Sequence, residues 1–241
     1  MLTATQLNRL IEPLIARSSR YCASKFSDRA ADLVLERLGV NTSGYATSIN
    51  SIINANDLTW WVDQKARRFF EAHPLGQGIE VNCGISTRFH RMSERSDWPQ
   101  FSWQSVNFPE VDDCLKFAIP EVDNFRSVAS AKPEEFWLKH LNGIGATAVF
   151  AVIGEADRLT FSQLKDLIDK LATINLTNLK HLELVIVHNL NSLQPMLDGV
   201  KLQPLVFDEW SAKPYSKFRF FLQRLFFKKR YRLNASYLKL H

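Results

Sequence analysis

The chain has 241 residues, of which 46% are hydrophobic and 23% are charged, and its net charge is +5. This composition is that of a folded globular protein and excludes a largely disordered chain. No apolar run reaches the roughly 20 residues that span a bilayer, and the first twenty residues lack a signal-peptide core. Cys22, Cys83 and Cys114 lie far apart without a CxxC spacing, which argues against a disulfide framework and a cysteine-ligated metal. We therefore expect a protein of the reducing cytoplasm without bound metal.

The positive charge is concentrated at the C-terminal end. Residues 211–241 hold nine Lys and Arg side chains and no acidic one, whereas residues 1–210 carry a net charge of −4. Nucleic-acid-binding proteins usually spread basic residues over a folded face, so this distribution argues against a nucleic-acid partner. Because phenylalanines accompany the basic residues, three interpretations of the segment stay open. It can be a helix packed on the protein body, a contact for an anionic membrane surface, or a contact for an acidic protein or nucleic acid.

The N-terminal third of the sequence has helical periodicity. Apolar residues recur at three- and four-residue spacing in the segments 6–16, 27–38 and 59–72, which predicts amphipathic helices. Ser27 or Asp28 can cap the second helix. We predict a helical cap over residues 1–75.

After residue 76, short apolar runs alternate with helical segments. The runs predict strands at 78–83, 101–108, 125–129, 146–153, 181–188, 204–210 and 231–240, and helices at 109–117, 133–141 and 161–174. Strands that alternate with helices are typical of an α/β fold with a mostly parallel sheet. We therefore expect residues 76–241 to form one α/β domain that packs with the cap as a single compact unit.

The first predicted strand ends in a turn at the edge of the sheet where ligands bind. In a parallel α/β sheet, ligands lie beyond the carboxyl ends of the strands, and this strand ends in EVNCGISTR at positions 80–88. A glycine in such a turn lets the backbone approach a ligand closely. The sequence contains neither GxGxxG nor GxxxxGK[ST], so the turn alone identifies no cofactor.

Several short motifs follow one another between residues 60 and 171. In order they are RRFFEAHP at 67–74, GISTRF at 84–89, VNFPEV at 106–111, FWL at 136–138 and the strand end at 151–154. This order and spacing resemble the leucine carboxyl methyltransferase family, and in particular its bacterial polyketide-synthesis-type O-methyltransferases. Segments 15–17 and 27–31 fit the family's N-terminal helices, so the resemblance covers roughly residues 10–190.

The resemblance implies a class I methyltransferase-like, Rossmann-like fold with a mostly parallel seven-stranded sheet, and S-adenosylmethionine (SAM) as cofactor. It implies SAM-dependent O-methylation of a carboxylate or hydroxyl on a small metabolite. The family's cofactor positions correspond to Glu80, Asn82, Gly84, Arg88, Asn107 and Glu134. Among these, Gly84 belongs to the glycine turn, Asn107 stands at the ribose and Glu134 at the adenine. The substrate would enter beneath the N-terminal helices around Arg17 and Trp60, and no catalytic residue is assigned.

The sequence departs from the family pattern around the cofactor. Asn82 occupies the position of the family's first glycine, and Asn107 that of its ribose-binding aspartate. Ser86 replaces an aspartate and Ile153 replaces a glutamate. Residues 58–60 lack an arginine that family members carry there. These departures favour a second hypothesis: a catalytically degenerate methyltransferase-like protein, or pseudoenzyme, that acts as a binding or scaffolding subunit. The basic, aromatic segment 211–241 would then contact a protein partner.

Several of these residues also have a structural interpretation. Glu80 can be a polar residue beside a turn, Arg88 can start a helix and pair with a surface acid, and Asn107 can cap the next helix. His90 can be a general base or a structural histidine. Trp60 is more typical of a core than of a substrate-stacking site, because aromatic residues dominate cores.

Overall fold

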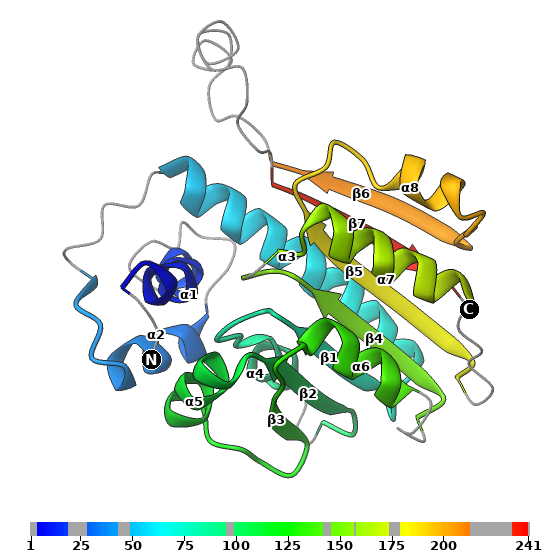
Figure 1. Cartoon of the computed structure of the whole chain (residues 1–241). Helices are drawn as coiled ribbons and strands as arrows, with labels where there is room; N and C mark the ends of the chain where they lie inside the picture. The colour runs from blue at the N-terminus through cyan, green and yellow to red at the C-terminus, as the bar shows by residue number, and fades with distance from the viewer. Residues whose placement is uncertain are drawn as a thin grey trace, which may run out of the picture.

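A seven-stranded sheet with helices on both faces forms the centre of the molecule (Figure 1). The computed structural model describes residues 4–18, 28–42, 49–94, 99–141, 146–156, 158–173, 179–212 and 233–240. The helices are α1 (Ala4–Arg17), α2 (Arg29–Arg37), α3 (Ile49–Ala72), α4 (Arg88–Ser93), α5 (Pro109–Ala118), α6 (Pro133–Leu141), α7 (Phe161–Thr173) and α8 (Gln194–Gly199). The strands are β1 (Gln77–Val81), β2 (Ser102–Asn107), β3 (Phe125–Ala129), β4 (Ala148–Ile153), β5 (His181–His188), β6 (Val206–Ser211) and β7 (Asn234–Lys239).

The order of the strands places a topological switch point at β1. The sheet runs β3-β2-β1-β4-β5-β7-β6; the first five are parallel, and β7 is antiparallel to both β5 and β6. The predicted mostly parallel, seven-stranded sheet is therefore confirmed. Because β2 lies on one side of β1 and β4 on the other, the chain changes direction across the sheet at this strand. Ligands of open α/β sheets bind beside such a point.

Two apolar clusters, one on each face of the sheet, explain why these segments fold together. β4 is buried at every position and β5 at seven of eight, as expected for parallel strands that helices cover on both faces. On one face, Leu14 and Phe69 share a cluster with Phe150 of β4, so the cap helices and the sheet have a common core. On the other face, Trp137 of α6 and Leu167 of α7 pack against the sheet. In Figure 1, α3 lies behind the sheet and α6 and α7 lie in front of it.

Some predicted boundaries were wrong. α3 begins at Ile49 rather than at residue 59, because the polar residues of its first turns obscure the apolar period. α4 and α8 were missed, since each has six residues and shows less than two periods. β1 ends at Val81, because Asn82 turns the chain with φ +54°.

The two ends of the chain are only partly within the described ranges. The predicted closing strand is confirmed as β7, whereas residues 213–232, which hold most of the basic and aromatic side chains of the C-terminal segment, lie outside them. The interpretations of that segment therefore stay predictions. None of the helices in the described ranges has the length and apolar character that crossing a bilayer requires.

Gly78 of β1 lies directly against an aromatic ring. It pairs with Trp103 across the β1–β2 ladder, and a Cβ atom on Gly78 would lie 2.1 Å from Cε3 of Trp103. Trp103 is buried and its indole donates a hydrogen bond to Glu80 at 3.0 Å. We expect Gly78→Ala to lower the free energy of unfolding by about 1–3 kcal/mol, because the indole must move. Urea unfolding tests this with Gly199→Ala as the control, because no described atom lies within 4 Å of a Cβ added at Gly199. Equal stability of the two variants would contradict the packing described.

Candidate cofactor site

The turn after β1 has the backbone of a ligand-binding turn. Asn82 and Gly84 have φ angles of +54° and +70°, a region that glycine adopts freely and that asparagine tolerates better than most residues. Asn82 donates through its N–H to Val106 O at 3.0 Å and accepts from Ala156 N–H at 3.1 Å. The turn is thus fixed to the carboxyl ends of β2 and β4. A Cβ on Gly84 would lie 2.8 Å from Cβ of Ala156 and 2.9 Å from Cδ2 of Leu10, which explains the glycine.

Asn107, at the carboxyl end of β2, supports this turn. Its Oδ1 accepts from Gly84 N–H at 3.1 Å, and its Nδ2 donates to Ser105 Oγ at 3.0 Å. The alternative that Asn107 caps α5 is wrong, since Phe108 is the N-cap residue and makes no side-chain cap. The position predicted for the ribose contact therefore carries a neutral amide whose two polar atoms already have partners.

Seven charged side chains, six of them buried and one, Glu155, partly buried, lie beside the turn, and we call them the acid–arginine cluster. Its members come from α1, the N-cap of α2, α3, β1, α4 and the loop after β4. They are Arg17, Asp28, Asp63, Glu80, Arg88, Arg91 and Glu155, and none has a side chain more than 11% exposed. The cluster thus links each of the first three helices to the strand ends where a ligand would bind.

Arg88, the first residue of α4, joins three carboxylates. Its Nε lies 2.9 Å from Asp63 Oδ1 and its Nη2 2.7 Å from Glu155 Oε2, and its Nη1 pairs with Glu80. Glu80 also accepts from Ser86 Oγ at 2.7 Å. The alternatives of a surface partner for Arg88 and a simple turn-side position for Glu80 are therefore wrong. Both residues are buried in one hydrogen-bonded network.

Arg91 connects the same network to the cap. Its Nε lies 2.8 Å from Asp63 Oδ2 and its Nη1 2.8 Å from Asp28 Oδ2. Asp28 also accepts from Thr87 Oγ1 at 2.6 Å and from Arg17 Nε at 3.2 Å, while its Oδ1 caps α2 through Ala31 N–H at 3.0 Å. The cap prediction for Asp28 is confirmed.

The arginines lower the pKa of three carboxylates of the cluster. Burial by itself raises the pKa of Asp63, but Arg91 and Arg88 outweigh it and hold the pKa below its usual range. The same balance lowers the pKa of Asp28, through Arg91 and Arg17, and that of Glu155, through Arg88 and Arg17. The pairing therefore maintains these three residues as carboxylates at neutral pH.

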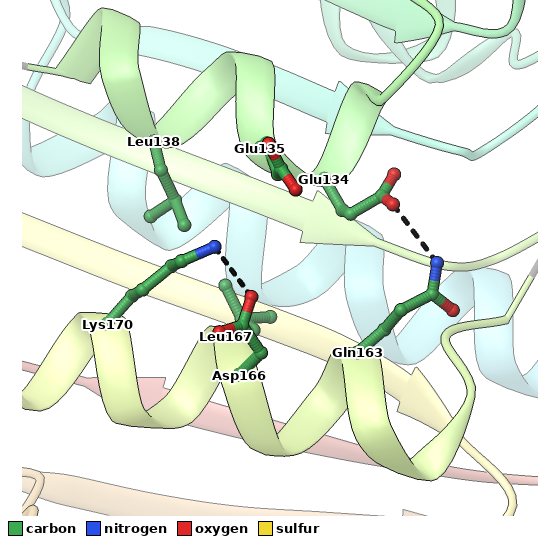
Figure 2. Close-up of a pocket in the computed structure, with 7 residues that line it drawn as sticks. All are labelled: Glu134, Glu135, Leu138, Gln163, Asp166, Leu167 and Lys170. Atoms are coloured by element: carbon green, nitrogen blue, oxygen red, sulfur yellow. Dashed lines mark hydrogen bonds and ion pairs between the residues drawn. The ribbon is translucent and has the colours of Figure 1, made fainter.

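Glu134 is in a different place from the other five predicted cofactor residues. It lies in the first turn of α6, and its Oε1 accepts from Gln163 Nε2 of α7 at 3.0 Å. Figure 2 shows this pair at one end of a groove between α6 and α7. The groove is lined by Glu134, Glu135, Leu138, Gln163, Asp166, Leu167 and Lys170. Hydrogen bonds and ion pairs connect Glu80, Gly84, Arg88 and Asn107 to the turn, whereas Glu134 contacts α7.

The positions of His90 and Trp60 in the structure correct two further predictions. His90 packs its ring 5.8 Å from that of Phe125, the first residue of β3, and so lies toward the amino end of the strand rather than the ligand edge. Burial lowers its pKa. Trp60 is 52% exposed and is not a core residue.

Ile153 faces the apolar cluster of α6 and α7, where a carboxylate would have no partner among these apolar side chains.

The comparisons with known proteins agree with a methyltransferase fold. No family model matches the chain. A stretch of 112 residues is 27% identical to the tetracenomycin polyketide synthesis O-methyltransferase TcmP of Streptomyces glaucescens, and it covers 46% of this chain but only 40% of that protein. Membership of the leucine carboxyl methyltransferase family therefore stays a prediction.

Solved structures confirm the fold class. The METTL16 methyltransferase domain superposes with a TM-score of 0.52 at 12% identity, covering 88% of this chain and 79% of that one. Fibrillarin from Aeropyrum pernix, solved with natively bound S-adenosyl-L-methionine, gives a TM-score of 0.41 at 14% identity over 68% of each chain. The match to METTL16, together with the strand order, confirms the predicted class I, Rossmann-like methyltransferase fold.

Asp63 is the residue whose loss should damage the cluster most. Asp63 forms ion pairs with two arginines, so Asp63→Asn leaves Arg88 and Arg91 without their shared carboxylate. We expect a loss of about 3–5 kcal/mol in the free energy of unfolding at pH 7, measured by urea unfolding. We expect this loss to become smaller below about pH 4. Because folding lowers the pKa of Asp63, its carboxylate stabilises the folded state at higher pH, and this stabilisation is lost on acidification.

Asp169→Asn is the control for that measurement. Asp169 pairs with Lys165 on the exposed face of α7, and such a pair contributes at most about 0.5 kcal/mol. A similar, small effect of both substitutions would show that the cluster does not hold the cap.

Proposed function

We propose that the chain binds SAM at the turn after β1 and transfers its methyl group to an oxygen atom of a small molecule. The observation that carries the proposal is the turn itself. It lies at the switch point of a class I methyltransferase fold and has left-handed residues at Asn82 and Gly84. It also contains a buried acceptor, Asn82 Oδ1, that has no hydrogen-bond partner within the described ranges of the chain. The 27% identity to an O-methyltransferase supports oxygen as the methylated atom.

The residues of the turn fit the methionine part of SAM better than the ribose part. Asn82 Oδ1 can accept from the ammonium group, and Gly84 holds the turn in a left-handed conformation that positions this acceptor. Asn107, in contrast, offers the ribose hydroxyls no free carboxylate oxygen. Glu134 has a buried Oε2 to which none of the described residues donates a hydrogen bond, and this suits the adenine amine that the resemblance assigns to it.

SAM supplies a methyl group already activated by its sulfonium, so the task of the protein is to hold two reactants in line and exclude water. The acid–arginine cluster would serve this task by fixing the turn and α4. A carboxylate acceptor is ionised at neutral pH and needs no general base. This favours a carboxylate over a hydroxyl as the methylated group, since His90, the one base suggested by the sequence, lies away from the ligand edge.

Asn107 favours a second candidate function, a methyltransferase-like subunit that has lost catalysis and binds a protein partner. The amide removes the charge that grips the ribose in the family, and its atoms are used to hold Gly84. Under this hypothesis the site keeps its fold but no longer binds the cofactor.

Calorimetric titration with SAM separates the two candidates. We expect a Kd in the micromolar range, about −8 kcal/mol at 1 µM. Gly84→Ala should weaken binding at least about tenfold, because its Cβ would press on Ala156 and Leu10 at a φ of +70°. Gly39→Ala is the matched control, since Gly39 also has a positive φ of +64° but has no atom within 4 Å.

The contradictory result is the absence of heat at millimolar SAM from protein that is folded by circular dichroism. The O-methyltransferase proposal would then be wrong, and the binding-subunit hypothesis would take its place.

A further inference from the structure

The acid–arginine cluster contains one more acid than base. Three guanidinium groups, those of Arg17, Arg88 and Arg91, face the carboxylates of Asp28, Asp63, Glu80 and Glu155. Glu80 accepts from Arg88, Ser86 and Trp103, and all three bonds suit the ionised form. The described part of the cluster therefore has a net charge of −1. A buried charge without a counter-charge is unfavourable, so a cationic ligand would be stabilised there.

Glu155 is the cluster acid that lies nearest to solvent and beside the turn. Its side chain is 11% exposed, whereas those of the other three carboxylates are at most 1% exposed. The neighbouring residues are bonded to the turn: Gly154 N–H donates to Val81 O at 2.8 Å, and Ala156 N–H donates to Asn82 O at 3.1 Å. The carboxylate of Glu155 is therefore held at the rim of the candidate cofactor site.

The environment of Cys83, in the middle of the turn, reports the sign of the local field. Its Sγ and carboxylate oxygens of Glu80 and Glu155 all lie within 4.8 Å of one another. Burial raises the pKa of the Cys83 thiol, and the two carboxylates raise it further against the opposing effect of Arg88. The two carboxylates therefore outweigh Arg88 at this thiol, although Arg88 donates to both of them.

A second and independent feature points to a ligand that donates hydrogen bonds. Among the residues that the structure describes, none donates a hydrogen bond to the side-chain oxygen of Asn82, and the residue is only 4% exposed. A buried acceptor in this condition is destabilising. A cationic ligand with N–H groups would satisfy the acceptor and offset the excess charge at once.

We propose that this charge makes the site select the sulfonium form of the cofactor, so that SAM binds more tightly than S-adenosylhomocysteine, with Glu155 carrying the preference. The inference rests on the proposed function. SAM has a sulfonium, an ammonium and a carboxylate, and hence a net charge of +1, whereas S-adenosylhomocysteine is neutral overall. In the transfer, the acceptor oxygen forms the new O–CH3 bond and the S–CH3 electron pair returns to sulfur. The positive charge of the cofactor is thus lost at that step, and the product would be released more easily.

Parallel calorimetric titrations with SAM and S-adenosylhomocysteine test the proposal on the full-length chain. We expect SAM to bind at least about tenfold more tightly, which corresponds to about 1.4 kcal/mol. Glu155→Gln keeps the shape of the side chain and brings the cluster to zero net charge, so it should reduce the preference to less than about threefold by weakening SAM alone.

Glu183→Gln is the matched control. Glu183 is also buried and paired, with Lys239 at 3.4 Å and Tyr237 at 2.6 Å, but it lies near the amino end of β5. This variant should keep the preference of the unmodified chain.

Each outcome decides between the claims. If neither compound binds, both the proposed function and the proposed preference for SAM over S-adenosylhomocysteine are wrong. If both bind to the unmodified chain with equal affinity, SAM binding stands and the selectivity is wrong. A preference that persists in Glu155→Gln would overturn the role of this residue. Even if that variant does not fold, the titrations of the unmodified chain decide whether the site prefers SAM.

Discussion

The pairing of buried charges beside the first strand is the constraint on which the rest of this structure depends. Charges removed from water are tolerated only when each finds a partner, and here the partners come from separate parts of the chain. Arg88 on α4 needs Asp63 on α3 and Glu80 on β1. Arg91 needs Asp63 and Asp28. The cap and the sheet must therefore assemble in one relative position for all of these groups to be paired.

This constraint also shapes the candidate cofactor site. Ser86 and Thr87 follow Gly84 and bond to Glu80 and Asp28, respectively. The conformation of the turn is thus set by the cluster on one side and by Asn107 on the other. Such a turn is preorganised, and a ligand bound there would not have to order it. The same buried residues that hold the cap would thereby determine how well the site binds its ligand.

The sequence predicted the elements whose signal is local. β4 is a continuous apolar run, β5 contains the apolar run LVIV at 184–187, and α7 has a clear apolar period. These local patterns predicted the three elements. The grouping of Glu80, Gly84, Arg88 and Asn107 followed from the resemblance to a family, because those positions fall at strand ends. α4 was missed, since six residues are too few to show a helical period.

The cluster itself could not be derived in this way. Most of its pairs join residues at least 25 positions apart, such as Arg88 with Asp63 and Arg91 with Asp28, and spacing along the chain says nothing about such contacts. One signal was present: Arg88 and Arg91 are three residues apart, so they lie on the same face if the segment is helical. Asn107 was misread as a helix cap because the sequence shows its neighbour Pro109 but not the Gly84 amide that lies beside it in space.

The cap, the cluster and the turn would act as one unit around the ligand. Hydrogen exchange measured with and without saturating SAM tests this coupling. We expect slower exchange in residues 82–93 and also in α1, whose Leu10 lies against Gly84 and whose Arg17 belongs to the cluster, with α8 unchanged. Bound SAM that protects only the α6–α7 groove around Glu134, or that leaves α1 unaffected, would contradict it.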